Sequence, residues 1–110
     1  MSLAVISPSV IRGTLTPPPS KSAAHRLLIA AALAGEGRVR GLSLSADMEA
    51  TLRAVRGLGV SVRLDGDAAC FAPAPPSSSP SPLPVDCGES GSTLRFLIPL
   101  YAARGIPAVF

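Results

Sequence analysis

Two short segments of the chain combine small polar residues with cationic side chains at the beginning of a predicted helix. Residues 20–26 read SKSAAHR and contain the only lysine, Lys21, and residues 88–95 read GESGSTLR. The first backbone amides of a helix have no internal partner and, with the helix dipole, attract anions. Hydroxyls add donors, glycine admits a ligand to the backbone, and lysine or arginine matches phosphate or carboxylate. The pattern therefore predicts a binding site for a small anionic ligand.

Each of these residues also has a simpler interpretation when it is taken alone. Ser22 suits a helix cap, Arg26 a solvated charge and Arg95 the partner of a nearby acid. His25, the single histidine, is more typical of a hydrogen-bonded structural residue than of a catalytic one. The duplication of the design, with the only lysine in one copy, favours the anion site.

The composition argues against several other classes of function. The net charge of +3 comes from ten scattered cationic residues and seven acids, whereas nucleic-acid binding usually shows a basic stripe. No uncharged apolar run approaches the ~18 residues of a membrane span. The start has no signal-peptide pattern, so we expect a cytoplasmic protein that binds neither nucleic acid nor membrane.

Cofactor and metal signatures are weak in this sequence. Residues 88–91 match neither a P-loop nor a dinucleotide-binding fingerprint, which disfavours ATP and NAD. One histidine and two well-separated cysteines, Cys70 and Cys87, are too few for a usual zinc site. We expect both cysteines to be free, buried thiols.

The order of predicted elements indicates an α/β (α+β) fold. A run of helix formers from 23 to 34 lies between serines and glycines that suit caps, and Asp65-Gly66 is a hairpin signal. Residues 73–84, rich in Pro and Ser, predict a loop. The expected strands are 3–6, 39–44, 60–64, 68–72 and 106–110, with a second short segment at 10–15; the expected helices are 23–34, 48–56 and 92–103, with a kink at Pro99. This is one strand-helix-strand-helix-hairpin unit followed by the start of a similar one, as in a piece of a larger protein.

Three motifs, in order, resemble the 5-enolpyruvylshikimate-3-phosphate (EPSP) synthase family. Residues 19–26 (PSKSAAHR), residues 43–48 (SLSADM) and residues 88–95 (GESGSTLR) are similar to consecutive stretches of that family. The resemblance covers about residues 13–110. Ser22 and the following His-Arg pair favour it over the sister transferase that acts on UDP-N-acetylglucosamine, which remains an alternative.

The resemblance implies a transferase of aromatic amino-acid biosynthesis. The family moves the enolpyruvyl group of phosphoenolpyruvate to the 5-hydroxyl of shikimate 3-phosphate, releases phosphate, and needs no metal or organic cofactor. It folds as two domains of βαβαββ repeat units, and the full-length protein is expected to be a monomer. Residues 1–110 would be its N-terminal portion, one unit plus the start of a second, inactive alone. A stand-alone phosphate-binding module and an interaction piece completed by another chain are the other hypotheses.

Site residues carry over by position in the two helix-leading segments. Lys21 would contact both substrates and take part in catalysis, and Ser22 and Arg26 would hold shikimate 3-phosphate. In the second segment Gly91 would lie against phosphoenolpyruvate, with Ser92 nearby.

Arg95 would support this second segment and its positive potential.

The sequence departs from the usual family pattern at three positions. Pro19 stands where glycine is usual, Glu89 where asparagine is common, and Ser92 where threonine is common. Glu89 adds an acid beside the predicted anion site.

Overall fold

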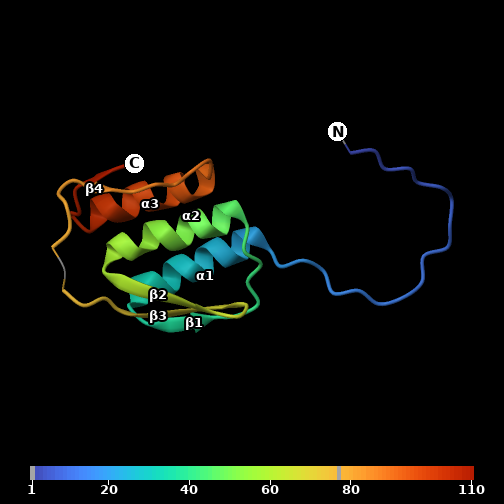
Figure 1. Cartoon of the computed structure of the whole chain (residues 1–110), viewed down its shortest axis with the longest axis horizontal. Coiled ribbons are helices and arrows are strands. Elements are labelled where there is room, and N and C mark those ends of the chain that lie inside the picture. The colour runs from blue at the N-terminus through green and yellow to red at the C-terminus, as the bar shows by residue number, and fades with distance from the viewer. Residues whose placement is uncertain (1, 77) are drawn as a thin grey trace.

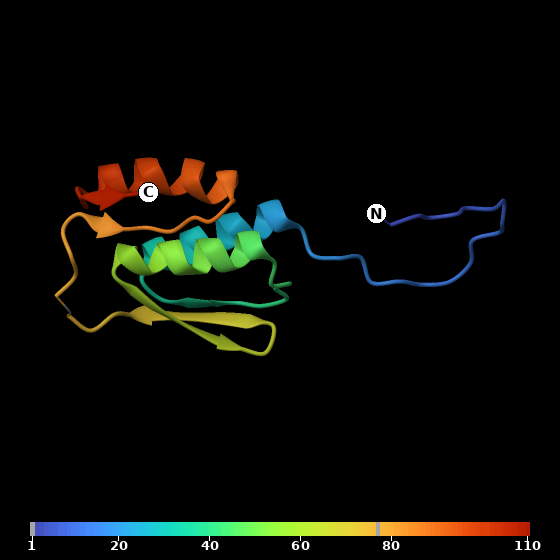
Figure 2. The same cartoon turned by 45° about the horizontal axis from the view of Figure 1, so that its top comes forward.

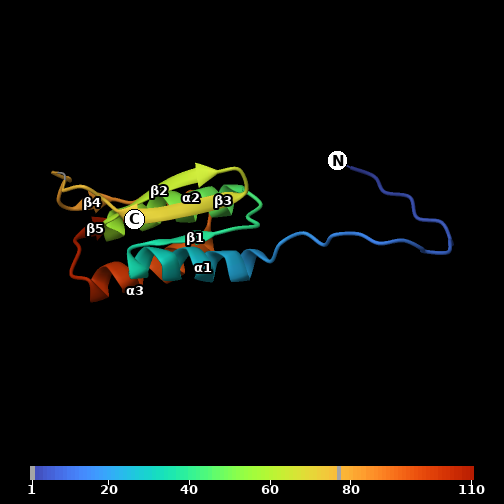
Figure 3. The ribbon, with the colours of Figure 1, turned by 90° about the horizontal axis from the view of Figure 1, so that it is seen from below.

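The described residues fold into three α-helices, one short 3-10 helix and two small sheets, with an extended N-terminal segment (Figure 1). The computed structural model describes residues 2–76 and 78–110. Residues 2–20 form neither helix nor strand and are exposed. They run away from the body of the molecule in Figure 1 and in the view from below (Figure 3).

Each of the three α-helices begins at a serine that caps it. α1 spans Lys21–Ala34 after Ser20, α2 spans Ala46–Val55 after Ser45, and α3 spans Gly91–Ala103 after Ser90; each serine hydroxyl accepts a hydrogen bond from a backbone N–H of the first turn. A cap of this kind satisfies one of the free amides of the helix start and so fixes where the helix begins.

The first sheet has three antiparallel strands in the order β1-β3-β2. β1 is Gly37–Val39, β2 is Val60–Asp65 and β3 is Ala68–Pro73. Asp65 pairs with Ala68, so a two-residue turn joins β2 to β3. Its first residue, Gly66, has φ +58°, a conformation that glycine adopts without strain.

The second sheet is a pair of adjacent parallel strands, one of which precedes α3 in the sequence and the other follows it. β4 is Leu83–Pro84 and β5 is Ala108–Val109. The helix α3 connects the two strands, as a crossover must when parallel neighbours are joined. A 3-10 helix, η1, Arg56–Leu58, continues α2 toward β2.

The helices form the middle and outer layers of the molecule. Figure 2 shows α1 and α2 between the three-stranded sheet and α3. The core joins these layers through buried apolar side chains, among them Leu28, Val55, Phe71 and Leu97. In Figures 1 and 2 the three helices run in the same direction, so their N-terminal ends lie at one end of the molecule.

The α/β class and all three helices are confirmed, but several boundaries differ. α1, α2 and α3 begin one to two residues earlier than expected because the capping serines lie earlier, and α3 continues through Pro99. The predicted strand 39–44 is wrong: β1 is 37–39, and Gly41 (φ +75°) turns the chain immediately afterwards. The final strand shortens from 106–110 to 108–109.

The predicted strand at residues 3–6 is also wrong in this structure. Its apolar side chains are exposed, and it pairs with none of the described strands. A strand needs a hydrogen-bonding neighbour, which local sequence cannot supply. Of the predicted loop 73–84, the ends belong to β3 and β4, and Ser77 lies outside the described residues.

Candidate functional site

The six predicted site residues lie on the starts of α1 and α3, and all are exposed. The starts of these two helices lie at the same end of the molecule (Figures 1 and 2). The structure therefore brings the two predicted anion-binding segments to the same end of the molecule, although about 65 residues separate them. The six are Lys21, Ser22, Arg26, Gly91, Ser92 and Arg95.

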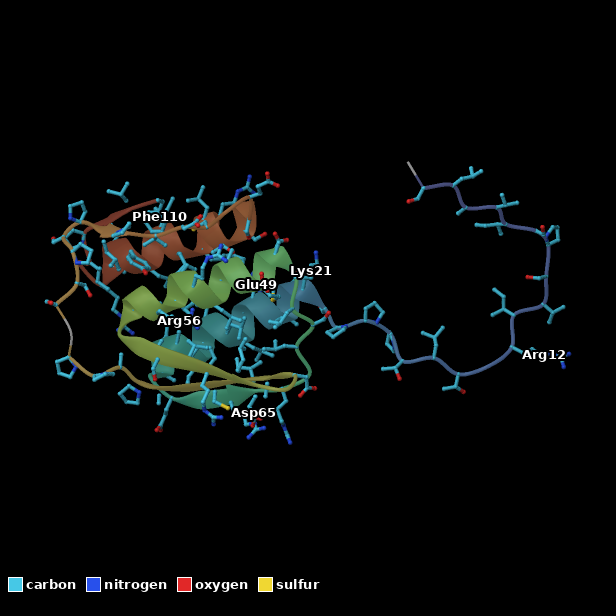
Figure 4. The ribbon with its side chains drawn as sticks, viewed as in Figure 1. Arg12, Lys21, Glu49, Arg56, Asp65 and Phe110 are labelled. Atoms are coloured by element: carbon cyan, nitrogen blue, oxygen red, sulfur yellow. The ribbon has the colours of Figure 1, made fainter. Side chains whose placement is uncertain are left out.

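Lys21 faces the beginning of the neighbouring helix α2. Its Nζ lies 3.8 Å from Oδ2 of Asp47, and the two side chains are 65% and 43% exposed. Figure 4 shows Lys21 at the end of the helices away from Arg56. Lys21 also lines a small hollow of about 110 Å³ together with Ser43 and Ser45. The ammonium group is thus held at the helix starts while remaining open to solvent.

Arg26 reaches from α1 to α3, where it contacts the residue that follows the second predicted segment. Its Nη1 donates to the carbonyl of Ser22 at 2.9 Å, and its guanidinium carbon lies 5.7 Å from the centre of the Phe96 ring on α3. An arginine within about 6 Å of an aromatic ring is attracted to its face. The guanidinium is therefore oriented against α3, which is more order than a freely solvated charge would have.

The second segment offers open space in front of its backbone. A Cβ built on Gly91 would meet no atom within 4 Å, and Gly91 lines a hollow of about 380 Å³ that Glu89 and Phe110 also line. Ser92 follows at the second position of α3. Arg95 forms no ion pair within the described residues, so the simpler interpretation of Arg95 as the partner of a nearby acid finds no support there.

The positive groups do not share one cavity in this structure. Arg26 and Arg95 both line a mostly apolar groove of about 340 Å³ between α1 and α3. Lys21 and Gly91 each line a different hollow. Arg26 and Arg95 therefore share one groove, whereas Lys21 and Gly91 lie at separate hollows.

Two parts of the site were not predicted from the sequence. One is the ion pair of Asp47 with Lys21. The Ser45-Ala46-Asp47 pattern is typical of a helix cap and does not indicate a contact with a lysine far away in the sequence. The other is a buried chain of polar side chains behind the site. His25 Nδ1 lies 2.8 Å from Oγ1 of Thr51, and Thr51 lies 2.8 Å from Oγ1 of Thr93.

The buried His25 supports the structural interpretation of this residue. Burial lowers the pKa of His25 below its ordinary value of 6.5, Asp47 partly opposes that shift, and Lys21 and Arg26 add to it. A neutral imidazole suits a position that is 4% exposed. The hydrogen bond to Thr51 satisfies the ring in the interior.

The remaining features concern other kinds of ligand. The described residues contain no group of three His, Cys, Asp or Glu side chains that could hold a metal ion. None of the described helices is long and apolar enough to cross a bilayer.

Cys70 and Cys87 are free, as expected, but Cys70 is only partly buried. A cavity of about 750 Å³ at the other end of the helices contains none of the six site residues.

Comparison with known proteins decides the family. Residues 5–110 match the family model of EPSP synthase (3-phosphoshikimate 1-carboxyvinyltransferase). The chain belongs to the EPSP synthase family. This agrees with the resemblance of its three motifs and favours it over the UDP-N-acetylglucosamine transferase alternative.

Curated relatives in this family come from several organisms. The chain is 38% identical over 101 residues to the 3-phosphoshikimate 1-carboxyvinyltransferase of Clostridium perfringens (strain SM101 / Type A), covering 91% of the chain and 24% of that protein. It is 42% identical over 100 residues to the protein of the same name from Anaeromyxobacter sp. (strain Fw109-5), covering 90% and 23%. The Methanopyrus kandleri relative is 44% identical over 89 residues, covering 77% and 21%. The chain thus spans about a quarter of the length of the EPSP synthases that it matches.

Proposed function

We propose that this chain supplies one wall of the active site of an enzyme that transfers the enolpyruvyl group of phosphoenolpyruvate to shikimate 3-phosphate. The observation that carries the proposal is the placement of the starts of α1 and α3 on one end of the molecule, with Lys21, Arg26 and Arg95 exposed beside them. Both substrates bear phosphate and carboxylate groups. Helix starts and fixed cations stabilise such groups and the negative charge that develops during transfer.

The first segment is assigned to shikimate 3-phosphate. Ser22 offers a hydroxyl in the first turn of α1, and Arg26 offers a planar fork of donors suited to phosphate. Lys21 is a mobile point charge at the start of α1, beside the start of α2, and is assigned to both substrates. Its partner Asp47, at 3.8 Å, is exchanged for a substrate anion at little cost because the pair is exposed.

The second segment is assigned to phosphoenolpyruvate. The open space in front of Gly91 admits an anion to the first amides of α3, with the Ser92 hydroxyl beside it. Arg95, one turn further, adds positive potential. In the reaction the 5-hydroxyl oxygen of shikimate 3-phosphate bonds to the enol carbon of phosphoenolpyruvate, the bond from that carbon to the phosphate oxygen breaks, and the phosphate leaves with, in the net balance, the hydroxyl proton. No metal or organic cofactor is part of the proposal.

The remaining groups of such an enzyme belong to the three quarters of the relatives that this chain does not match. We propose that the chain is the N-terminal portion of a monomeric, cytoplasmic protein of this kind. The described residues contain α1-β1-α2-β2-β3, with no strand before α1, followed by β4-α3-β5. One βαβαββ unit and the start of a second therefore remain a prediction for the complete protein.

Two experiments test this function. First, phosphoenolpyruvate and shikimate 3-phosphate are titrated into the 15N-labelled chain, and the amide signals of residues 20–26 and 88–95 are followed. We expect weak binding of each compound at these segments and none for uncharged shikimate analogues. Binding centred instead on the cavity near Arg53 and Arg56 would overturn the assignment.

Second, the chain replaces the matching quarter of the Anaeromyxobacter relative, and phosphate release is measured in the chimaera. We expect enolpyruvyl transfer that depends on both substrates and is lost in Lys21→Ala. A chimaera that folds but is inactive, together with a chain that binds inorganic phosphate alone, would favour the stand-alone anion-binding module.

A further inference from the structure

Four buried polar side chains form a continuous hydrogen-bonded chain through all three helices. It runs from His25 Nδ1 to Thr51 Oγ1 (2.8 Å), to Thr93 Oγ1 (2.8 Å), and on to Ser90 Oγ (2.6 Å). The four residues come from α1, α2, the first turn of α3 and its cap. Their exposed fractions are 4%, 0%, 0% and 5% in that order.

Filling the interior does not by itself require this series of hydrogen-bonded polar side chains. Buried polar groups cost stability unless they are hydrogen-bonded, and apolar side chains of the same shape fill space without that risk. In the described residues no buried side-chain nitrogen or oxygen lacks a partner. A fully satisfied network adds directional constraint between the elements that it joins.

The hydrogens have one arrangement in which every hydroxyl donates within the chain. Ser90 Oγ accepts from the backbone N–H of Thr93 and donates to Thr93 Oγ1. Thr93 then donates to Thr51, and Thr51 donates to Nδ1 of the neutral His25. The opposite direction would leave the Ser90 hydrogen with no acceptor that the described residues provide. The preferred direction makes Nδ1 of His25 the final acceptor.

The members of this chain adjoin the proposed substrate contacts. His25 directly precedes Arg26, Ser90 directly precedes Gly91, and Thr93 directly follows Ser92. Thr51 is the exception, because it lies on α2, which carries no proposed contact, and it joins the other two helices. The orientation of Arg26 against Phe96 lies across the same α1–α3 junction.

We propose that His25, Thr51, Thr93 and Ser90 are positioning residues that hold the starts of α1 and α3 in register, so that the two substrates meet at reacting distance. This inference rests on the proposed function for its catalytic consequence and on the geometry alone for the positioning itself. A displacement of about 1 Å at a reacting centre is able to lower a rate by about a hundredfold.

Thr51 is the residue at which to test the proposal. Thr51→Val keeps the shape and removes the hydroxyl, whereas Thr51→Ser keeps the hydroxyl and removes a methyl group. Val55→Ala is the matched control, because Val55 is fully buried on the same helix and takes no part in the hydrogen-bonded chain. It weakens the core without breaking the connection between α1 and α3.

The first readout is geometric and uses the 110-residue chain. Nuclear Overhauser contacts between the Arg26 side chain and the Phe96 ring, and the 15N shift of His25 Nδ1, are recorded for each variant. We expect Thr51→Val to weaken those contacts and change the Nδ1 shift, and Thr51→Ser and Val55→Ala to preserve both. Contacts that are unchanged in Thr51→Val would overturn the positioning role, whatever the ligand.

The second readout is kinetic and uses the chimaera with the Anaeromyxobacter relative. We expect Thr51→Val to lower kcat about tenfold to a hundredfold with smaller changes in either KM, Thr51→Ser to restore most of kcat, and Val55→Ala to leave it near the parent value below its unfolding temperature. Equal losses in Thr51→Val and Val55→Ala would show a purely structural role. An inactive parent chimaera would count against the proposed function, and the geometric readout would still decide the positioning.

Discussion

Lys21 Nζ lies 3.8 Å from Oδ2 of Asp47, across the junction between the starts of α1 and α2. Both side chains are substantially exposed, so water screens their attraction and the pair contributes little to folding. The same exposure leaves the ammonium group accessible to an incoming anion. The contact holds Lys21 where the proposed site needs it, without burying it.

Replacing Lys21 should therefore affect binding far more than stability. We expect Lys21→Ala to abolish measurable phosphoenolpyruvate binding while changing the free energy of unfolding by less than about 1 kcal/mol. Titration and urea denaturation measure the two effects. Arg38→Ala is the control, since Arg38 also forms an exposed ion pair, with Asp65 at 3.1 Å; an equal loss of binding in that variant would point to net charge alone.

Neutralising Asp47 should change binding in the opposite direction. Asp47→Asn removes a negative charge next to the proposed anion site. A unit charge at ~6 Å in water is worth about 0.7 kcal/mol, so phosphoenolpyruvate should bind about threefold more tightly. The gain should disappear at high salt, where such interactions are screened; weaker binding in Asp47→Asn would show that the carboxylate orients Lys21 in the bound state.

Two glycines should respond very differently to the same methyl group. A Cβ on Gly91 meets open space, whereas a Cβ on Gly57 would overlap the hydroxyl of Tyr101. We expect Gly91→Ala to fold normally and to weaken phosphoenolpyruvate binding, because the methyl group enters the proposed anion position. Gly57→Ala should lose about 1–3 kcal/mol of stability, the usual range for overpacking.

The Gly57 effect has an internal check. The Tyr101 hydroxyl donates to the carbonyl of Ala54 at 2.6 Å, and burial raises the pKa of Tyr101 to about 12. Tyr101→Phe removes this oxygen, so the double variant should be more stable than the sum of the single losses predicts. Strict additivity would contradict the proposed steric cause.

Stability should depend on pH through His25. Burial lowers the pKa of His25 in the folded chain below the ordinary value of 6.5. At a pH just below 6.5 the unfolded chain therefore binds a proton at His25, whereas the folded chain keeps this imidazole neutral. The contribution is fully present above pH 6.5 and is lost as the pH falls toward the folded pKa. Urea denaturation between about pH 7.5 and 5.5 should show this slope, and His25→Gln should flatten it; identical slopes would exclude His25 as the cause.

The N-terminal segment should be cleaved before the folded body. Residues 2–20 are exposed and irregular, and Arg12 is the only trypsin site before Lys21. Limited trypsin digestion followed by mass spectrometry should therefore yield residues 13–110 first. Removing residues 2–12 should leave the unfolding midpoint unchanged; a lower midpoint would show that this segment packs on the body in solution.

Much of the local structure follows from local chemistry. Ser20, the alanine- and leucine-rich run and Gly35 specify the beginning, body and end of α1, and each acts within a few residues of its neighbours. The Asp65-Gly66 turn specifies the hairpin in the same way. The sequence also predicts two segments that bind anions, since a helix start with small and cationic residues carries its chemistry in consecutive positions; their binding of anions stays a prediction.

Other features depend on residues far apart in the chain. The apolar residues 3–6 have strand character but find no neighbour among the described strands, because pairing is a property of two segments. The contact of Thr51 with Thr93 spans 42 positions, and the ion pair of Lys21 with Asp47 spans 26, so neither leaves a periodic signal. The residue types thus determined which segments are predicted to attract anions. Tertiary structure decided that the starts of α1 and α3 lie at the same end of the molecule, because strand β1, and then strands β2, β3 and β4, return the chain between successive helices.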